Sequence, residues 1–244
     1  MRNKPKIIFV LLLCLLPMLS FGQKGVTTFG VQYKPIIPNP MIGTYKQDFN
    51  IDHFESSVTQ KIGHHFGMVI RRGITDIISI ETGIAFTQRN FGLSFAVPDS
   101  NLAATDNVGF IGYEIPISGL IYTRLGDNFF MNTSLGASFN YFPSDVRVEV
   151  PIAVNEYFLQ EGARLNRIQG AMLANIGFEY RTKKNGYFYL GGSYNLPFAS
   201  IVTFAMSYEY PPGNTVVLDN IRGSYLTLDL RYYFNEKPDK DRKR

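Results

Sequence analysis

The sequence predicts an all-β protein, namely an eight-stranded antiparallel up-and-down barrel that crosses a membrane. Segments alternate between apolar and polar side chains with the period of two that marks a strand, over stretches longer than the about 5 to 6 residues typical of soluble strands. Short and long connections follow one another in strict alternation. Hydrophobic residues make up 45% of the chain and include 20 Phe and 15 Tyr, yet no helical period of comparable length is present.

Residues 1–22 indicate a secretory signal peptide. Basic residues such as Arg2 precede an apolar run over residues 7–19, and Gly22 stands at the spacing of a cleavage site. The run is shorter than the about 20 apolar residues that a spanning helix needs, so we expect no membrane anchor there. Cleavage after Gly22 would remove the single cysteine, Cys14, and with it any disulfide bond or cysteine metal site. Lipidation of Cys14 is disfavoured, because a leucine rather than a small residue precedes it.

Each strand candidate has one apolar face and one face that carries polar or charged residues. In the last candidate, Leu226, Leu228 and Leu230 face one way, whereas Asp229 and Arg231 face the other. A strand of this kind lies between two different solvents, so we expect lipid on one side and a polar interior on the other. In chain order the candidates span residues 26–34, 59–71, 77–89, 109–125, 129–142, 168–181, 187–198 and 225–234.

The connections predict the topology. Three short ones, at residues 71–76, 125–128 and 182–186, carry the Gly, Asp and Asn of tight turns. An outer-membrane barrel has three such periplasmic turns, four long external loops and both chain ends in the periplasm. A soluble β-sandwich has shorter strands, and a lipocalin-like barrel has mostly short connections, so both are less favoured. The four long connections are residues 35–57, 90–107, 144–166 and 199–220.

The last strand is expected to close the barrel by pairing with the first, because an open edge is not tolerated in lipid. We therefore expect one barrel domain over residues 23–234 and a charged, solvated periplasmic tail over residues 235–244, with docking of this tail to another protein as the less favoured alternative. The aromatic end of the strand also resembles the signal that the outer-membrane insertion machinery recognises. The residues expected to carry that signal are Leu226, Leu228, Leu230, Tyr232 and Phe234.

Aromatic residues near the strand ends are expected in two bands at the membrane interfaces. The chain contains no Trp, so Tyr and Phe would supply both bands. The residues expected there are Tyr113, Phe139, Tyr141, Tyr180, Tyr194, Tyr232 and Phe234.

Acidic and basic residues both occur at the strand positions that are expected to face the barrel interior. An eight-stranded barrel is only wide enough for its own side chains, so we expect these charges to pair and fill the interior. A proton or ion pathway is the alternative, because ionisable groups at membrane depth are candidates for function. The inward charged positions are Lys34, Lys61, Arg71, Glu81, Arg89, Glu114, Arg124, Glu179, Arg181, Asp229 and Arg231.

Nothing in the sequence predicts an enzyme, a cofactor or a metal site. The motifs HExxH, GxSxG and the P-loop are absent, and the histidines do not cluster with carboxylates. Some outer-membrane barrels modify lipids with a His and a Ser or an acid, so His64 and His65 keep that function as a third alternative. Charges of both signs are mixed along the chain, which disfavours a nucleic-acid partner.

A stretch that combines prolines with apolar residues leaves the first strand at residues 34–43. It is either a stiff loop that packs on the rim of its own barrel or a contact for a partner protein. The candidate contact residues are Pro35, Ile36, Ile37 and Pro38.

The stretch FGMVIRRGITDIISIETGIAFTQRNF at residues 66–91, together with GVQYKPIIP at residues 30–38, resembles the PorT/SprT outer-membrane barrels of the type IX secretion system. The resemblance implies a non-enzymatic component of the outer membrane of Gram-negative cells, delivered there after cleavage of a Sec-type signal. It also implies a role in the export of proteases and adhesins, and in gliding motility in some relatives.

The partners expected from this resemblance are outer-membrane lipid, the insertion machinery and other secretion components. The resemblance assigns no functional residue. A stand-alone structural or adhesive barrel is the alternative to this role.

Overall fold

The computed structural model describes residues 25–38, 45–182, 184–211 and 213–235, which form thirteen strands and one short 3-10 turn, η2 (Pro98–Ser100). The described chain therefore has five strands more than the eight that the sequence predicted. The strands are β1 (Thr27–Ile37), β2 (Lys46–Ile51), β3 (Phe54–Gly73), β4 (Ile78–Val97), β5 (Leu102–Arg124), β6 (Phe129–Tyr141), β7 (Val146–Ala153), β8 (Glu156–Arg164), β9 (Ile168–Arg181), β10 (Tyr187–Pro197), β11 (Val202–Tyr210), β12 (Gly213–Ile221) and β13 (Tyr225–Tyr233).

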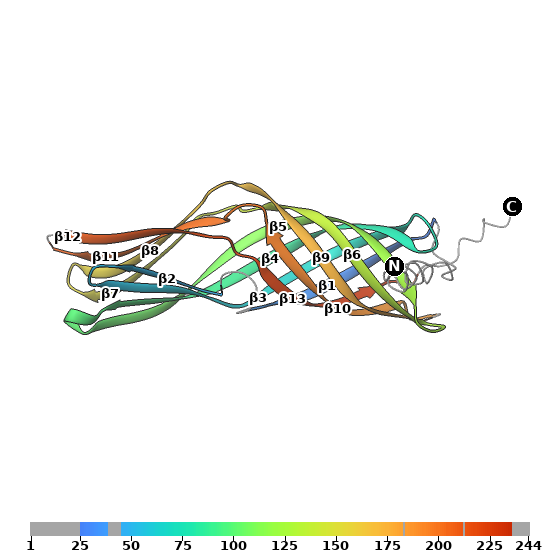
Figure 1. Ribbon diagram of the computed structural model, residues 1–244, viewed down its shortest axis with the longest axis horizontal. Coiled ribbons are helices and arrows are strands. Elements are labelled where there is room, and N and C mark those ends of the chain that lie inside the picture. The colour runs from blue at the N-terminus through green and yellow to red at the C-terminus, as the bar shows by residue number, and fades with distance from the viewer. Residues whose placement is uncertain (1–24, 39–44, 183, 212, 236–244) are drawn as a thin grey trace, which may run out of the picture.

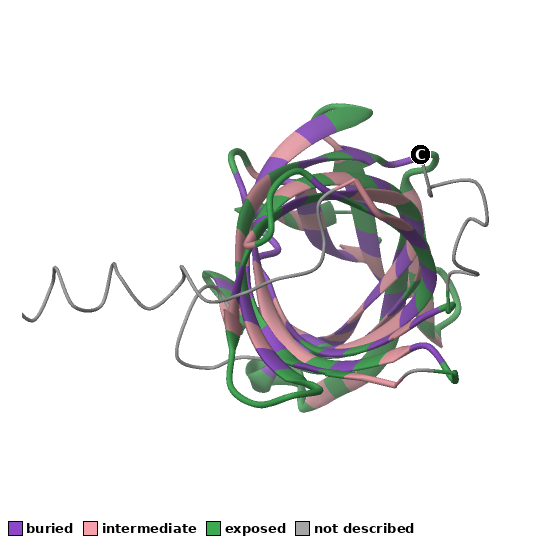
Figure 2. Cartoon of the chain, turned by 90° about the vertical axis from the view of Figure 1, so that its right-hand side faces the viewer, coloured by how far each residue is buried: buried purple, intermediate pink, exposed green. Residues whose placement is uncertain are grey.

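Part of the fold is a closed ring of antiparallel strands, which we call the ring. Its order is β1-β13-β10-β9-β6-β5-β4-β3, and β3 pairs with β1 to complete it. The first and last strands meet in register, with Gly30 opposite Tyr233 and Tyr33 opposite Leu230. Figure 2 shows the ring along the long axis of the molecule, with buried and exposed residues alternating along the strands. The ring therefore has no unpaired edge.

Tight turns join the ring strands at one end of the molecule, here called the turn end. They lie at residues 74–77, at residues 125–128 and between β9 and β10, where turn backbone bonds such as Leu125 N to Phe129 O and Thr182 N to Gly186 O form. Gly186 has a φ of 80°, which a glycine adopts without steric cost. Figure 1 shows these turns at the end of the molecule opposite to β7, β8, β11 and β12.

The opposite end is a second β-structure, which we call the head. It comprises β2, β7, β8, β11 and β12 together with residues 54–60 of β3, 91–97 of β4 and 102–110 of β5. The strands β12-β11-β8-β7 form their own four-stranded sheet, and β2 pairs with β3. The prediction that residues 35–57, 90–107, 144–166 and 199–220 are loops was wrong for most of these residues.

The reason lies in the side-chain pattern, which β4 shows along its whole length. Its inward side chains are polar in the ring, as with Glu81 and Arg89, and become apolar in the head with Phe91 and Phe95. Its outward side chains change the opposite way, from residues such as Ile84, which is 54% exposed, to polar ones. The strand continues unbroken while the apolar face moves from the outside to the inside.

The head is filled by an apolar core rich in aromatic rings. Phe95 stacks on Phe158 at a centroid distance of 5.2 Å, and Phe110 stacks on Phe204 at 5.5 Å. These rings come from both sheets of the head, so their packing holds the two sheets together. The buried residues of this core are Phe49, Phe54, Val58, Phe91, Leu93, Phe95, Val97, Val108, Phe110, Phe142, Phe158, Ile201, Val202, Phe204, Met206, Tyr208 and Ile221.

The outer wall of the ring is strongly apolar. Large side chains point outward from its strands and stay exposed, for example Ile176 at 55% on β9 and Phe188 at 50% on β10. A contiguous exposed apolar surface of this kind marks contact with a membrane or a partner. In the described part of the chain, no helix combines the length and the apolar character needed to cross a bilayer.

The aromatic residues predicted for the interface bands all lie outside the head core. Tyr113, Phe139, Tyr141, Tyr180 and Phe234 are exposed, and Tyr194 and Tyr232 are half-buried. Residues 1–22 of the predicted signal peptide lie outside the described residues, as does the predicted tail apart from Asn235.

Candidate functional site

The candidate site is a polar network inside the ring. Strand alternation turns every second side chain of each ring strand inward, and at these positions the sequence places charged residues on β1, β3, β4, β5, β9 and β13. Seven of these groups form one unbroken series of ion pairs in which cations and anions alternate. In order they are Arg181, Glu179, Arg71, Glu81, Arg231, Asp229 and Lys34.

The half of the network nearer the turn end centres on Glu179, which is fully buried. Its Oε1 accepts a bond from Arg181 Nε at 2.6 Å, and its Oε2 accepts one from Arg71 Nη1 at 2.6 Å. Arg71 also pairs with Glu81 across the β3–β4 ladder at 3.2 Å. The single carboxylate of Glu179 therefore holds two guanidinium groups together.

The other half of the network centres on Asp229, which is also fully buried. Arg231 Nη2 bonds Asp229 Oδ2 at 2.6 Å, and Lys34 Nζ lies 3.3 Å from the same oxygen. The hydroxyls of Ser193 and Thr227 donate to the two oxygens of Asp229, each at 2.6 Å. These partners offset the free-energy cost of removing the carboxylate from water. An isolated buried carboxylate would have no such compensation.

Aromatic rings fill the space around the guanidinium groups. Arg71 lies over the ring of Tyr233 at 3.8 Å, and the Tyr233 hydroxyl donates to Glu81 at 2.6 Å. Arg181 lies over Phe130 at 3.9 Å. These cation–π contacts satisfy the flat faces of guanidinium groups whose edges bond carboxylates.

A smaller group of polar residues lies toward the head. The Glu114 carboxylate accepts bonds from Asn195 Nδ2 at 3.2 Å and from the Tyr225 hydroxyl at 3.3 Å, and no cation of the described residues pairs with it. Arg89 donates to the carbonyl oxygen of Gly223 at 3.0 Å and lies over the Tyr225 ring at 4.6 Å. Tyr225 therefore links an acid and a base that do not touch.

The space left inside the ring is small. One cavity lies between the network and the Glu114 group, with Lys34, His65 and Asn175 among its lining residues, and its volume is about 30 Å³. Such a volume holds about one water molecule. In the described residues the ion pairs, aromatic rings and amides therefore form a packed polar core around this cavity.

The structure brings together most of the predicted interior charges, but two of them lie exposed. Lys61 points outward and is exposed, because a β-bulge between Lys61 and His64 shifts the register of β3. Arg124 lies exposed at the turn end and pairs with Asp127 of the following turn at 3.0 Å.

Sequence reasoning missed the uncharged partners of the network, chiefly Tyr233, Tyr189, Asn175 and Ser193. Tyr189 donates to Asn175 at 2.7 Å, and Asn175 donates to Asp229 at 3.1 Å. Their inward parity was the available signal. Tyr233 and Asn175 lie an even number of residues from a charged inward position on their own strands, and Tyr189 lies opposite Glu179 and Arg231. Ser193 lies opposite Asn175 and Thr227.

The predicted insertion signal lies on the outer face of the last strand. Leu228, Leu230 and Phe234 are exposed, and Leu226 and Tyr232 are half-buried. The role of these residues stays a prediction.

Among the candidate partner contacts, Ile37 is 45% exposed, whereas Ile36 is fully buried. Pro35 and Pro38 are half-buried. Ile37 is thus the apolar side chain of this segment that a partner could reach, and the rest of the predicted segment, residues 39–43, lies outside the described residues.

The two neighbouring histidines lie on opposite sides of the ring wall. His65 is buried inside the ring near Gln32 and Thr87, whereas His64 points outward and bonds the Tyr33 hydroxyl at 2.9 Å. Neither bonds a serine or an acid of the described residues. Across the same residues, no group of three or more His, Cys, Asp or Glu side chains could hold a metal ion.

No model of a known protein family matches the sequence, and no curated protein matches it. Among solved structures, the crystal structure of the outer membrane protein OprG from Pseudomonas aeruginosa matches with a TM-score of 0.54. The match covers 89% of this chain and 99% of that chain at 11% sequence identity. The chain has the fold of an outer-membrane β-barrel. At this identity the likeness concerns the fold alone, so the role of the barrel has to be argued from its own residues.

Proposed function

We propose that the ring spans the outer membrane, with the turn end in the periplasm and the head outside the cell. The exposed apolar wall of the ring requires an apolar solvent, while the polar surface and apolar core of the head suit water. Short turns on the periplasmic side and long connections outside are the usual arrangement of such barrels.

Within that membrane, the protein is proposed to be a non-enzymatic component of the type IX protein secretion machinery. The resemblance of residues 30–38 and 66–91 to the PorT/SprT barrels supports this role. The observation that carries the mode of action is the filled interior, with its series of ion pairs and a cavity of only about 30 Å³. A ring filled in this way cannot conduct a folded protein, so it acts as an accessory or scaffold that contacts a larger translocon.

The head is the largest surface that such an accessory offers outside the membrane. Exposed apolar residues there include Val154 at 89% and Leu218 at 67%. The same residues favour the second candidate function, a stand-alone structural or adhesive barrel, because an adhesive head also needs an apolar contact surface.

The test is secretion in a strain that lacks the protein, with the full-length chain restored as the control. Loss of surface and released proteases, with precursors retained in the periplasm and no general leakage of the outer membrane, is the expected result. Normal export would overturn the secretion role and leave the stand-alone barrel. A stable complex with other secretion components in mild detergent is the second expected result.

A further inference from the structure

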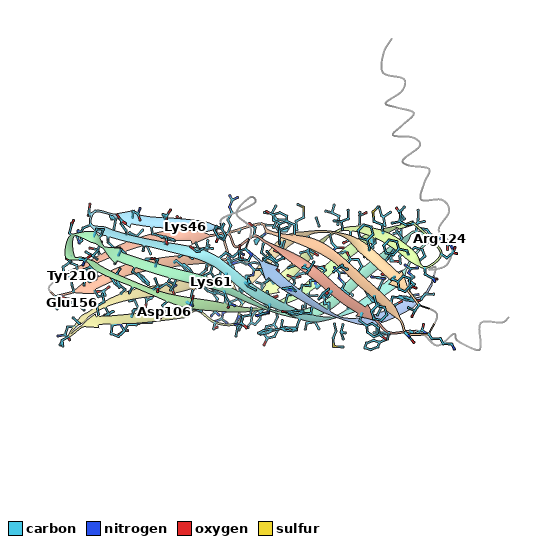
Figure 3. All side chains as sticks on the ribbon, turned by 90° about the horizontal axis from the view of Figure 1, so that it is seen from below. Lys46, Lys61, Asp106, Arg124, Glu156 and Tyr210 are labelled. Carbon is cyan, nitrogen blue, oxygen red and sulfur yellow. The ribbon has the colours of Figure 1, made fainter. Side chains whose placement is uncertain are left out.

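A recess on the outer surface marks the junction of ring and head. It is lined by residues of β3, β4 and β5 together with Pro38 and Tyr45, and its volume is about 660 Å³. It lies at the level where the outward residues change from apolar to polar. Figure 3 places its residue Lys61 between the head, marked by Glu156 and Tyr210, and the turn end, marked by Arg124. The lining residues used below are Lys61, Ile62, Gln88, Asn90, Asn107 and Gly109.

The bulge in β3 is what aims Lys61 into this recess. The register of β3 against β4 shifts between Lys61 and His64, and Lys61 points outward. Without this shift, the alternation that turns His65 inward would turn Lys61 inward as well. Bulges of this kind redirect a side chain and are common next to functional sites. The result is a cation on the outer surface at the edge of the apolar wall.

Two glycines make room for the side chains that cross the recess. A Cβ at Gly92 would lie 2.6 Å from Lys61 Cε, so a larger residue there would require the lysine side chain to move from its place across β4. Its Nζ reaches Asn107 Oδ1 on β5 at 2.5 Å. At Gly109 a Cβ would lie 3.1 Å from Asn90 Oδ1, so that side chain also leans over a glycine.

The recess offers one positive charge and several amide groups. Asn90 Nδ2 donates to the carbonyl oxygen of Ile62 at 2.9 Å, and Gln88 Nε2 donates to Asn90 Oδ1 at 3.3 Å. No carboxylate of the described residues pairs with Lys61, whereas the other lysine of the head region, Lys46, pairs with Asp48 at 2.7 Å. An ammonium that has no carboxylate partner and lies among amide groups favours an anion with several oxygen acceptors.

Apolar residues border the recess on the side of the ring. Ile62 is 62% exposed and Ile111 is 42% exposed on the adjoining outer wall. A ligand that binds here therefore meets a cation and amides at one end and an apolar wall at the other. This combination matches an amphiphile with an anionic head and an acyl tail.

We propose that this recess binds the phosphate-bearing head of an outer-leaflet membrane lipid, with Lys61 bonding the phosphate and Ile62 and Ile111 contacting the acyl chain. The inference rests on the proposed placement of the ring in the outer membrane. It commits to lipid phosphate rather than free phosphate because the recess opens directly onto the apolar wall.

The test uses the full chain in detergent micelles, titrated with a phosphorylated lipid A, with the same lipid after dephosphorylation, and with inorganic phosphate. Native mass spectrometry counts the bound molecules. Phosphorylated lipid is expected to bind about tenfold more weakly to Lys61→Gln, the loss of one charge-assisted bond, and to bind Lys46→Gln like the wild type. Gly92→Ala, which displaces the Lys61 side chain, is expected to weaken binding in the same direction.

Equal binding by Lys61→Gln and wild type, or equal binding of the dephosphorylated lipid, would overturn the inference. Retention of inorganic phosphate as strongly as the lipid would show a free-phosphate site instead and would overturn it too. Insertion of the same variants into lipid vesicles is measured separately, from their resistance to alkaline extraction. A chain that does not insert contradicts the proposed membrane placement, whereas a chain that inserts but binds lipid independently of Lys61 contradicts only this inference.

Discussion

At the scale of single residues, the interior charges stabilise the barrel only as a connected set. Glu179 is fully buried and is the contact between Arg181 and Arg71, whose guanidinium groups both bond it at 2.6 Å. Removing one member of a buried ion pair leaves its partners charged and desolvated, which costs about 3 to 5 kcal/mol. A pair exposed to water is worth only about 0 to 1 kcal/mol.

We therefore expect Glu179→Ala to lower the free energy of unfolding by about 3 to 5 kcal/mol. The control is Arg124→Ala, which removes the exposed pair with Asp127 and is expected to cost at most about 1 kcal/mol. The chain has no Trp, so urea unfolding in micelles is followed by circular dichroism and by the heat-dependent mobility of the folded barrel on gels. Similar losses in the two variants would show that the buried pairs add nothing beyond surface ones.

At the scale of elements, the alternation of each strand could be read from the sequence, but the end of the barrel could not. On β4 the predicted strand ends at residue 89, because the outward face then turns polar. Yet Phe91, Leu93, Phe95 and Val97 keep the same parity and continue inward as the head core. A pattern with apolar residues on one face does not say which face is inside, so the head was mistaken for loops.

Lys61 shows the other limit of the sequence. Its predicted inward direction assumes unbroken alternation, and a single bulge on β3 reverses it. By contrast, Glu81, Glu179, Asp229 and Arg231 lie inward as predicted, because regular ladders surround them. Local parity is thus readable where the ladder is regular, while bulges and uncharged partners such as Tyr233 depend on contacts between distant strands.

The head is expected to unfold separately from the ring when its core is damaged. Phe204 on β11 is fully buried and packs on Phe110 at 5.5 Å and Phe91 at 6.2 Å, so Phe204→Ala should cost about 3 to 5 kcal/mol. The ring, which has its own ladders and ion pairs, should stay closed. Limited proteolysis of intact cells or vesicles, with gel mobility as the readout for the ring, tests this.

The matched control is Phe139→Ala, an outward residue of the ring that is 59% exposed. Its removal creates no cavity in the head, so the head should resist protease as in the wild type. Loss of ring mobility together with head cleavage in Phe204→Ala would instead show that head and ring fold as one cooperative unit.

At the scale of the whole molecule, the interiors of the ring and the head differ in polarity. The ring has a polar interior and an apolar wall, and the head has an apolar interior and a polar surface. The ring is closed by the β1–β3 and β1–β13 ladders, and the interior of the head is filled by its aromatic core. Such a molecule presents surfaces rather than a passage, which is why the proposed secretion role depends on contact with partners.

The closed interior also predicts that the protein does not conduct ions. In planar bilayers we expect no stepwise conductance from the wild type. Ion pairs and aromatic side chains fill the interior of the ring and leave space for about one water molecule. The triple variant Arg71→Ser, Glu81→Ser and Arg231→Ser removes the centre of the network and no outward side chain, so water should enter and a leak should appear. Stable channels formed by the wild type would show that the network opens in the membrane, and would move the proposed role from scaffold toward conduit.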